Sequence, residues 1–446
     1  MIQAVLDMSN LSIQLLQTLK PWRNAKAWHV ALSGGLDSTV LLHLLAQLRQ
    51  THSLPALTAV HVHHGLQAAA DAWPAHCQAV CDSLGVPLQV FHVQVRPGAS
   101  LERAAREARY RAFEAVTQAD EVLLTGQHRD DQAETLLFRL LRGAGVSGLS
   151  SMPHDRTLGL GRMCRPLLDV SRAELEAYAR SHGLNWVEDP SNTQTAFSRN
   201  YLRHEVIPAL TKRWPQATAS MARTAAHCAE AQGLLEELAQ QDLAAANTPH
   251  TEFAWLGLPS LALAPIAALS AARQRNVLRY WLAGFTQLPD TDHWAGWEAL
   301  RDAREDAHPI WKLADGQLHR ASGHVWWLAG DWLRQPCGPI LWHNPEVPVS
   351  LPGNGQLRLL GDIPAGPLHV SYRQGGEVMA LAQRGHRDLK RLFNEQGVPG
   401  FVRGRLPLLY RNEQLLAVAN LNGLAFGPCG HWQLQWLPTS SDQGLS

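Results

Sequence analysis

Residues 31–39 constrain the fold of this chain more than any other stretch of its sequence. An apolar run at 27–32 leads into the glycine pair of this segment, and leucines at helical spacing follow it from 40 to 48. A strand, a glycine turn and a helix in this order direct backbone N–H groups and a helix N-terminus at one point, which favours an anion. Gly34 and Gly35 let the main chain approach that anion because they carry no β-carbon. The segment therefore predicts an α/β fold with an anion-binding turn.

Residues 33–38 read Ser-Gly-Gly-Leu-Asp-Ser, and this order of residues excludes two common phosphate loops. The Walker A loop requires a lysine, and the dinucleotide fingerprint requires G-x-G-x-x-G, so neither describes this turn. Ser-Gly-Gly-x-Asp-Ser is the signature of pyrophosphate-loop ATPases, which adenylate a substrate and release pyrophosphate. Asp37 indicates bound Mg²⁺, because a carboxylate repels phosphates unless a cation lies between them. A plain turn in which Asp37 caps the helix is the structural alternative.

The composition is that of an ordinary soluble protein and sets limits on function. The 446 residues predict two to four domains, with 46% hydrophobic and 17% charged residues. A formal net charge of zero gives no general attraction to nucleic acid, so an RNA partner requires local basic patches. Six cysteines in a chain of this length do not form a disulfide framework. Neither a leader nor a membrane-spanning pattern is found in the sequence, which predicts a cytoplasmic protein.

Strand and helix patterns alternate from about residue 26 to 165. Strands are predicted at 27–32, 57–62, 88–95 and 121–125, and helices at 39–50, 71–84 and 101–117. Strands separated by helices of this length predict βαβ units in a parallel, Rossmann-like sheet. Right-handed crossovers then place the loops that follow the strands at one edge of the sheet, where such folds bind ligands.

Three polar loops follow predicted strands and should converge on one cleft at that edge. The first is 33–38, the second begins at His61, and the third spans 126–135. A first-turn acid of the third loop, such as Asp131, could simply cap the following helix. Capping does not explain Glu134, which comes one turn later on the same helical face. We therefore predict a functional acid cluster in this loop.

The helix predicted at 101–117 contains arginines that have two interpretations. Arg106 and Arg109 alternate with glutamates, a pattern typical of a solvated helix face with i,i+4 ion pairs. The alternative is that some of these arginines contact phosphate.

The part of the chain after the alternating region is predicted to be mainly helical. Ser171 and Glu174 form a capping box that opens a helix. A later helix carries Arg199 and Arg203 on a common side. From about 216 to 335 the sequence is alanine-rich with a helical pattern.

A basic region lies near the C-terminus, after a Pro/Gly-rich zone at 335–355 that predicts a linker. Residues 371–413 hold eight lysines or arginines against four acids, a local excess that the zero net charge conceals. Phe393, Phe401 and Tyr410 are interleaved with them, and this mixture suits phosphate contact combined with base stacking. The alternative is a small β/α module with a charged surface.

These motifs together resemble the tRNA(Ile)-lysidine synthase family over nearly the whole chain. The family often has Asn where His63 stands and a second His where Gln127 stands. The motifs that carry the resemblance are Ser33-Gly-Gly-Leu-Asp-Ser38, His61-Val-His-His-Gly65, Arg106-Glu-Ala-Arg-Tyr110, Thr125-Gly-Gln-His-Arg-Asp-Asp-Gln-Ala-Glu-Thr135, Arg165-Pro-Leu-Leu168, Asp189-Pro-Ser-Asn192, Arg199-Asn-Tyr-Leu-Arg203, Arg373-Gln-Gly-Gly-Glu377 and Leu389-Lys-Arg-Leu-Phe393.

The resemblance implies three domains and a two-step ligase reaction. The domains are an N-terminal parallel-sheet, Rossmann-like pyrophosphate-loop domain at 1–215, a helical substrate- and tRNA-binding domain at 216–335, and a small mixed tRNA-binding domain at 350–446. With ATP and Mg²⁺, the enzyme adenylates the C2 oxygen of the wobble cytidine in an AUA-decoding isoleucine tRNA with a CAU anticodon. Free L-lysine then attacks C2 and expels AMP, which leaves lysidine. A homodimer is left open, and no membrane is involved.

The resemblance also implies roles for individual residues. Asp37 holds the metal, and Asp131 and Glu134 hold the lysine ammonium group and accept its proton. Arg106 and Arg109 contact the tRNA backbone or the activated cytosine. The residues implied to bind ATP are Ser33, Gly34, Gly35, Leu36, Asp37, Ser38, His61, Gly126 and His128. The residues implied to bind tRNA are Arg199, Arg203, Arg373, Arg387, Lys390 and Arg391.

Two other functions stay open on the sequence. A tRNA thiolase with the same loop needs a reactive cysteine, usually a pair, and Cys164 near a strand end has no obvious partner. A non-catalytic module that binds an adenine nucleotide has no use for Asp37, Asp131 and Glu134 together.

Overall fold

A computed structural model describes residues 2–439, apart from 66–67, 96–100, 288–292, 305–306, 363, 365, 382–384 and 422–431. The chain divides into two compact units, Met1–Gly233 and Leu234–Ser446, and each is described by itself. In the described ranges no helix has both the length and the apolar content that a membrane span requires.

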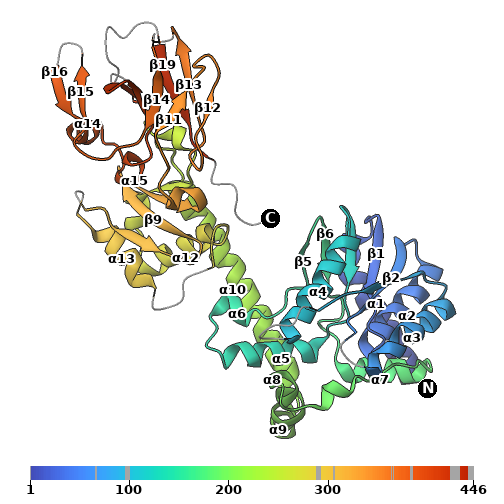
Figure 1. The fold of residues 1–446 in the computed structure, drawn as a ribbon. Helices are drawn as coiled ribbons and strands as arrows, with labels where there is room; N and C mark the ends of the chain where they lie inside the picture. The colour runs from blue at the N-terminus through green and yellow to red at the C-terminus, as the bar shows by residue number, and fades with distance from the viewer. Residues whose placement is uncertain are drawn as a thin grey trace. The chain divides into compact units, whose positions relative to one another are not determined.

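The first unit is built on a six-stranded sheet whose strand order is β3-β2-β1-β4-β6-β5 (Figure 1). Five of the strands are parallel, and β5 runs antiparallel to β6 at the edge. Because β2 and β4 flank β1 on opposite sides, the crossovers after β1 and before β4 open a crevice at the carboxyl ends of the strands. The strand bounds are β1 Ala27–Ala31, β2 Ala56–His63, β3 Leu88–His92, β4 Glu121–Leu124, β5 Asp155–Leu158 and β6 Gly161–Cys164.

The predicted alternation of strands and helices is confirmed, with bounds that differ by a few residues. The third strand is the shortest relative to its prediction, because β3 ends at His92 and does not reach residue 95. A helix also precedes the first strand. The helices of this region are α1 Ile2–Thr18, α2 Leu36–Thr51, α3 Trp73–Leu84, α4 Leu101–Val116 and α5 Arg129–Leu140.

Side chains of the parallel strands alternate between two apolar layers, as a pleated strand requires. On one face, Trp28, Val30 and Leu124 pack with α2 and with Tyr178 of α7, Arg172–Ser181. On the other face, Leu123 of β4 packs with residues of α4, β5 and β6. The sheet is therefore covered on both sides, and its polar loops are left at the carboxyl edge.

The first unit continues through short helices into one long helix. One of the short elements, η4, is a single turn of π-helix between α8 and α9, and such turns often occur at functional sites. The elements are α6 Val146–Leu149, η3 Pro190–Thr193, α8 Ser198–Tyr201, η4 Leu202–Val206, α9 Ile207–Arg213 and α10 Ala217–Ala246. The domain boundary predicted at 215/216 lies just before α10 and stays a prediction.

The first part of the second unit contains more than the helices predicted for it. The helices α11, α12 and α13 pack on a four-stranded antiparallel sheet with the order β7-β10-β9-β8. The prediction omitted these strands because they are three to six residues long and carry tryptophans rather than a clear alternation. The bounds are β7 Ser260–Ala262, α11 Leu263–Ala267, α12 Ala271–Leu282, α13 Trp294–Asp302, β8 Ile310–Lys312, β9 Gly316–Ala321 and β10 His324–Ala329.

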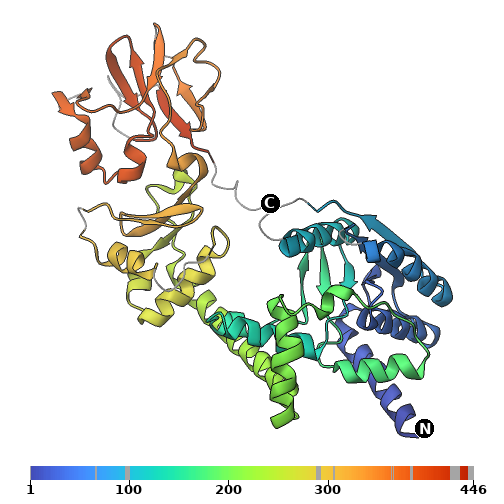
Figure 2. The ribbon, with the colours of Figure 1, turned by 60° about the horizontal axis from the view of Figure 1, so that its bottom comes forward.

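The remainder of the second unit consists of short antiparallel strands and two short helices, shown in orange and red in Figure 2. The zone predicted as a linker is ordered, because Trp342 and Leu351 are buried in the same core as Trp326. The bounds are β11 Ile340–Trp342, β12 Val349–Ser350, β13 Gln356–Gly361, β14 Leu368–Ser371, β15 Val378–Leu381, β16 Gly385–Asp388, α14 Leu389–Glu395, α15 Gly400–Arg403, β17 Leu408–Arg411, β18 Gln414–Val418 and β19 Trp432–Leu437.

Candidate active site

The turn between β1 and α2 has the shape of an anion cradle. Gly34 has a φ of +86°, a left-handed conformation that favours glycine. The hydroxyl of Ser38 donates to the Gly35 carbonyl at 3.1 Å and accepts from the Ser33 N–H at 3.2 Å, which fixes the turn. Gly35 is the N-cap of α2 and supplies no side-chain bond to its first turn, which begins with the buried Leu36. The free N–H groups of that turn are suited to an anion.

The loop after β4 presses directly on this turn. A β-carbon at Gly126 would lie 3.0 Å from the Asp37 carbonyl carbon and 3.0 Å from the Ser38 nitrogen. Contacts this short are tighter than nine in ten contacts of real β-carbons, so a side chain here would push the two loops apart by a few tenths of an ångström. The predicted convergence of the first and third loops is therefore confirmed.

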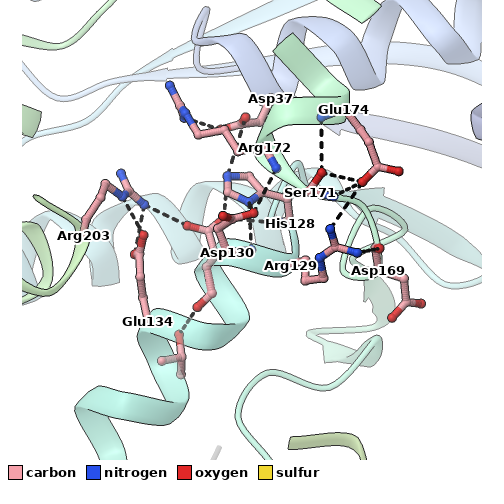
Figure 3. Close-up of polar contacts among 12 residues, drawn as sticks. Asp37, His128, Arg129, Asp130, Glu134, Asp169, Ser171, Arg172, Glu174 and Arg203 are labelled. Carbon is pink, nitrogen blue, oxygen red and sulfur yellow. Dashed lines mark hydrogen bonds and ion pairs between the residues drawn. The ribbon is translucent and has the colours of Figure 1, made fainter. Parts of the chain in front are cut away.

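His128 lies between the acids of the two loops, and its side chain is only 2% exposed (Figure 3). Its Nε2 is 3.7 Å from Asp37 Oδ1 and 3.5 Å from Asp131 Oδ2. Burial alone would lower the pKa of His128, but the carboxylates of Asp130, Asp131 and Asp37 raise it above its ordinary value. Burial raises the pKa of Asp37, and the nearby charge of His128 opposes that effect.

The start of α5 uses His128 and Asp131 as a reciprocal cap. The Asp130 N–H donates to His128 Nδ1 at 3.2 Å, and the His128 N–H donates to Asp131 Oδ2 at 3.1 Å. Capping therefore explains part of the role of Asp131. When His128 is neutral, this cap leaves its proton on Nε2, which faces Asp37 and Asp131.

Glu134 extends the acid cluster by one helical turn and is 1% exposed. Arg203 of η4 donates to both of its oxygens, at 2.6 and 2.9 Å, and to Asp131 Oδ1 at 3.0 Å. Arg199 lies 3.7 Å from the Glu134 carboxylate and donates to the Thr135 hydroxyl at 2.7 Å. Burial raises the pKa of Glu134, and the arginines oppose that effect. Two arginines predicted to bind tRNA are thus placed against the acid cluster, and Figure 3 shows Arg203 there.

Arg172 belongs to the same cluster, and the sequence analysis missed it. Its backbone N–H donates to Asp130 Oδ2 at 2.9 Å, and its Nη1 lies 3.9 Å from Asp37 Oδ2. The capping box of Ser171 and Glu174, which was predicted, positions it at the first residue of α7. A basic residue in the first turn of a helix opposes the helix dipole, and this was the available signal that Arg172 has an acidic partner elsewhere.

Near the end of β2, His61 contacts the residue that precedes the glycine turn. His61 is 2% exposed and donates from Nδ1 to the Leu32 carbonyl at 2.8 Å, so its Nε2 is left as an acceptor. Among the described residues this Nε2 has no hydrogen-bond partner. Arg109 of α4 donates to His64 at 3.3 Å, and burial together with this arginine lowers the pKa of His64 to about 4. The second loop therefore also reaches the predicted edge.

The remaining predicted residues lie outside this cluster. Arg106 of α4 donates to the Tyr110 hydroxyl at 3.3 Å. In the second unit, Arg373 lies 3.7 Å from Glu377, and Arg391 of α14 lies 3.0 Å from Glu395. Arg387 on β16 and Lys390 on α14 are exposed, as is Arg391.

The donor set fits a magnesium ion shared with phosphates. Asp37 Oδ1 is buried and accepts no hydrogen bond from a described residue. Mg²⁺ in nucleotide sites is bound by one or two carboxylates together with phosphate oxygens and water, so Asp37 with Asp131 nearby is sufficient. Among the described side chains, no group of three His, Cys, Asp or Glu converges to hold a metal alone.

Models of three known protein families match successive parts of the chain. The PP-loop domain matches residues 8–210, the TilS substrate binding domain matches 261–326, and the TilS substrate C-terminal domain matches 368–436.

Relatives align with the chain over almost its full length. A tRNA(Ile)-lysidine synthase of Pseudomonas fluorescens (strain Pf0-1) is 67% identical over 98% of this chain and 98% of its own. The Pseudomonas aeruginosa protein of that name is 64% identical over 98% of this chain and 99% of its own. The Escherichia coli O157:H7 protein is 42% identical over 87% of this chain and 91% of its own. The chain belongs to the tRNA(Ile)-lysidine synthase family.

Proposed function

We propose that this protein ligates lysine to C2 of the wobble cytidine of an isoleucine tRNA with a CAU anticodon. The reaction proceeds through ATP-dependent adenylation of the base, and the product is lysidine. The observation that carries the proposal is the position of His128, which lies within 3.7 Å of both Asp37 and Asp131 beside the glycine turn. Asp37, the proposed metal ligand, and Asp131, a proposed ligand of the lysine amine, can therefore act on one nucleotide.

In the first step the C2 oxygen of cytidine attacks the α-phosphorus of ATP, and the bond to pyrophosphate breaks. The turn 33–38 holds the leaving pyrophosphate through the N–H groups at the start of α2. Gly126 keeps the third loop against this turn, and His61 and His128 border the nucleotide. Asp37 would hold Mg²⁺, which would neutralise the negative charge that develops on the phosphates.

In the second step the side-chain amine of lysine attacks C2, and AMP leaves with the C2 oxygen. The amine has an ordinary pKa of about 10.4 and must lose a proton before it attacks. Asp131 and Glu134 bind the ammonium group and accept that proton. Arg203 already bonds to these carboxylates, but each ionised carboxylate has about four acceptor sites, so lysine can share them with Arg203.

The RNA is bound by arginines of both units. Arg109, which contacts His64 of the second loop, would bind the tRNA backbone or the activated cytosine. The wobble base belongs to a single-stranded loop, so it can be unstacked and inserted into a pocket. In the second unit, Arg373, Arg387 and Lys390 with Arg391 supply phosphate contacts to the rest of the tRNA. We place the reaction in the cytoplasm, where tRNA, ATP and free lysine occur together.

The test is incubation of the protein with radiolabelled lysine, ATP and unmodified tRNA with a CAU anticodon. We expect label in acid-precipitable RNA, with release of pyrophosphate and AMP in equal amounts. The same tRNA with uridine at the wobble position is the matched control and should take up no label. Absence of label in the cytidine tRNA would contradict the proposal.

Thiolation of tRNA is the weaker candidate. Burial raises the pKa of the Cys164 thiol to about 12, so at neutral pH it is not the thiolate that sulfur transfer requires. Burial likewise raises the pKa of Cys77 to about 12 and that of Cys81 to about 11. No described cysteine of the sheet is therefore suited to carry sulfur.

A further inference from the structure

Two arginines from different elements converge on one tyrosine at the edge of the first sheet. The guanidinium of Arg106, on α4, lies 4.9 Å from the centre of the Tyr110 ring. That of Arg156, on the edge strand β5, lies 4.8 Å from the same centre. Arg106 also donates to the Tyr110 hydroxyl at 3.3 Å. Both arginines have exposed side chains, so their remaining N–H donors are accessible to a ligand.

A third arginine, Arg165, is buried beside the same tyrosine and adds its positive charge. Arg165 is 4% exposed, donates from Nη1 to the Pro153 carbonyl at 2.7 Å, and has a buried Nε without a described hydrogen-bond partner. Burial lowers the pKa of Arg165, and the charges of Arg156 and Arg106 lower it further. Burial alone would raise the pKa of Tyr110, but the three arginines lower it below its ordinary value. Tyr110 therefore lies in a strongly positive field.

The charge of these three arginines is not paired with a carboxylate among the described residues. Within the described part of the chain, Arg106, Arg156 and Arg165 form no ion pair with a carboxylate. The contrast with their neighbourhood is sharp, because Arg162 on the same hairpin as Arg156 is paired with Asp155. The three positive charges repel one another, most strongly where Arg165 is buried. A bound anion would therefore stabilise the cluster.

The position of the cluster selects the kind of anion. In the strand order β1-β4-β6-β5, the edge strand that carries Arg156 is three strands from the glycine turn. At 4.7–4.9 Å per strand this is about 14 Å, so a triphosphate seated at that turn does not also fill the cluster. The positive field continues toward the acid cluster, because burial, Arg199 and Arg106 lower the pKa of Arg139 on α5. A polynucleotide whose base reaches Glu134 would pass this point.

We propose that Arg106 and Arg156 form a binding site for a backbone phosphate of the RNA close to the wobble nucleotide. Both pack against the Tyr110 ring, and the buried Arg165 adds its charge to the site. This inference rests on the proposed function, since it takes tRNA as the substrate. Arginine is suited to the site because its planar fork bonds two phosphate oxygens at once. Arg156, which no sequence motif singled out, thereby becomes a substrate-binding residue.

The test measures binding of three probes to the full chain: unmodified tRNA, the isolated anticodon stem-loop, and ATP with Mg²⁺. For Arg156→Ala we expect about tenfold weaker binding of both RNAs, with a salt slope smaller by about 1. ATP affinity should stay within twofold. Arg156→Lys should retain part of the affinity and the wild-type salt slope. Arg180→Ala, which removes an exposed arginine paired with Glu176, is the matched control and should change none of the three.

Three outcomes would overturn the inference. Weaker ATP binding with unchanged RNA binding would assign the cluster to the triphosphate. A loss seen with whole tRNA but not with the stem-loop would place the contact far from the wobble nucleotide. Unchanged binding of every probe would make the cluster a structural feature only. If Arg156→Ala weakens RNA binding while the wild-type protein transfers no lysine, the proposed function fails and the phosphate site stands.

Discussion

Replacement of Arg203 separates two roles that the sequence and the structure suggest for it. The sequence predicts a tRNA contact, whereas the structure places Arg203 in three hydrogen bonds with the carboxylates of Glu134 and Asp131. Glu134 has a side chain that is 2% exposed, and that of Arg203 is 30% exposed. Removal of one partner of a buried ion pair costs 3–5 kcal/mol, because the other charge is left buried without compensation. Since Arg203 is partly exposed, we expect Arg203→Met to cost about 3 kcal/mol of unfolding free energy.

The measurement is urea unfolding of the full chain, together with tRNA affinity. Met keeps much of the apolar stem of Arg203, so the loss reports on the guanidinium rather than on packing. Arg180→Met removes an exposed pair with Glu176 and should cost less than about 1 kcal/mol. The double variant Arg203→Met with Glu134→Gln should recover about 2 kcal/mol of the loss, because the uncompensated charge is then absent.

The opposite result would refute this reasoning. If Arg203→Met left unfolding unchanged within about 0.5 kcal/mol and weakened tRNA binding with a smaller salt slope, Arg203 would be a tRNA ligand. The ion pair with Glu134 would then contribute nothing to the stability of the protein.

Three further experiments test separate parts of the protein. Asp37→Asn removes the proposed metal ligand, so pyrophosphate release should fall about 100-fold or more while tRNA affinity is retained; unchanged release would contradict the metal role. Gly126→Ala places a β-carbon 3.0 Å from the backbone of Asp37 and should cost about 1–3 kcal/mol and weaken ATP binding. The same change at Gly233, where space is open within α10, should increase stability in thermal unfolding, and equal effects at both glycines would contradict the steric argument. Lys390→Ala combined with Arg391→Ala should weaken tRNA binding and lower its salt slope by about 1–2, and an unaltered slope would leave the C-terminal patch a solvated surface.

Local features of the sequence were sufficient for the first domain. The spacing of apolar residues predicts alternating strands and helices, because side chains repeat every two residues in a strand and every 3.6 in a helix. Gly34 marks the left-handed turn, since its φ of +86° is costly for other residues. Because loops that follow parallel strands lie at one edge of the sheet, the meeting of the Asp37 loop with the His128 loop could be predicted from this alternation.

Short elements and a segment without periodicity could not be predicted in the same way. The strand β8 has three residues, too few for a periodic signal, and it is stabilised by partners such as Trp311 on Trp294. The Pro/Gly-rich zone at 335–355 has the composition of a linker, yet Trp342 and Leu351 are buried in a core formed by distant strands. In both cases burial against remote residues outweighs local propensity.

By itself the sequence determined which chemical groups the site contains and which edge of the sheet carries them. Only the tertiary structure decided how those groups are paired. Arg203 meets Glu134 across 69 residues of chain, and Arg172 meets Asp130 across 42. The physical reason is that backbone conformation depends on neighbouring residues. The partner of a charged side chain depends instead on how whole helices and strands pack, which the spacing of residues in the sequence does not indicate.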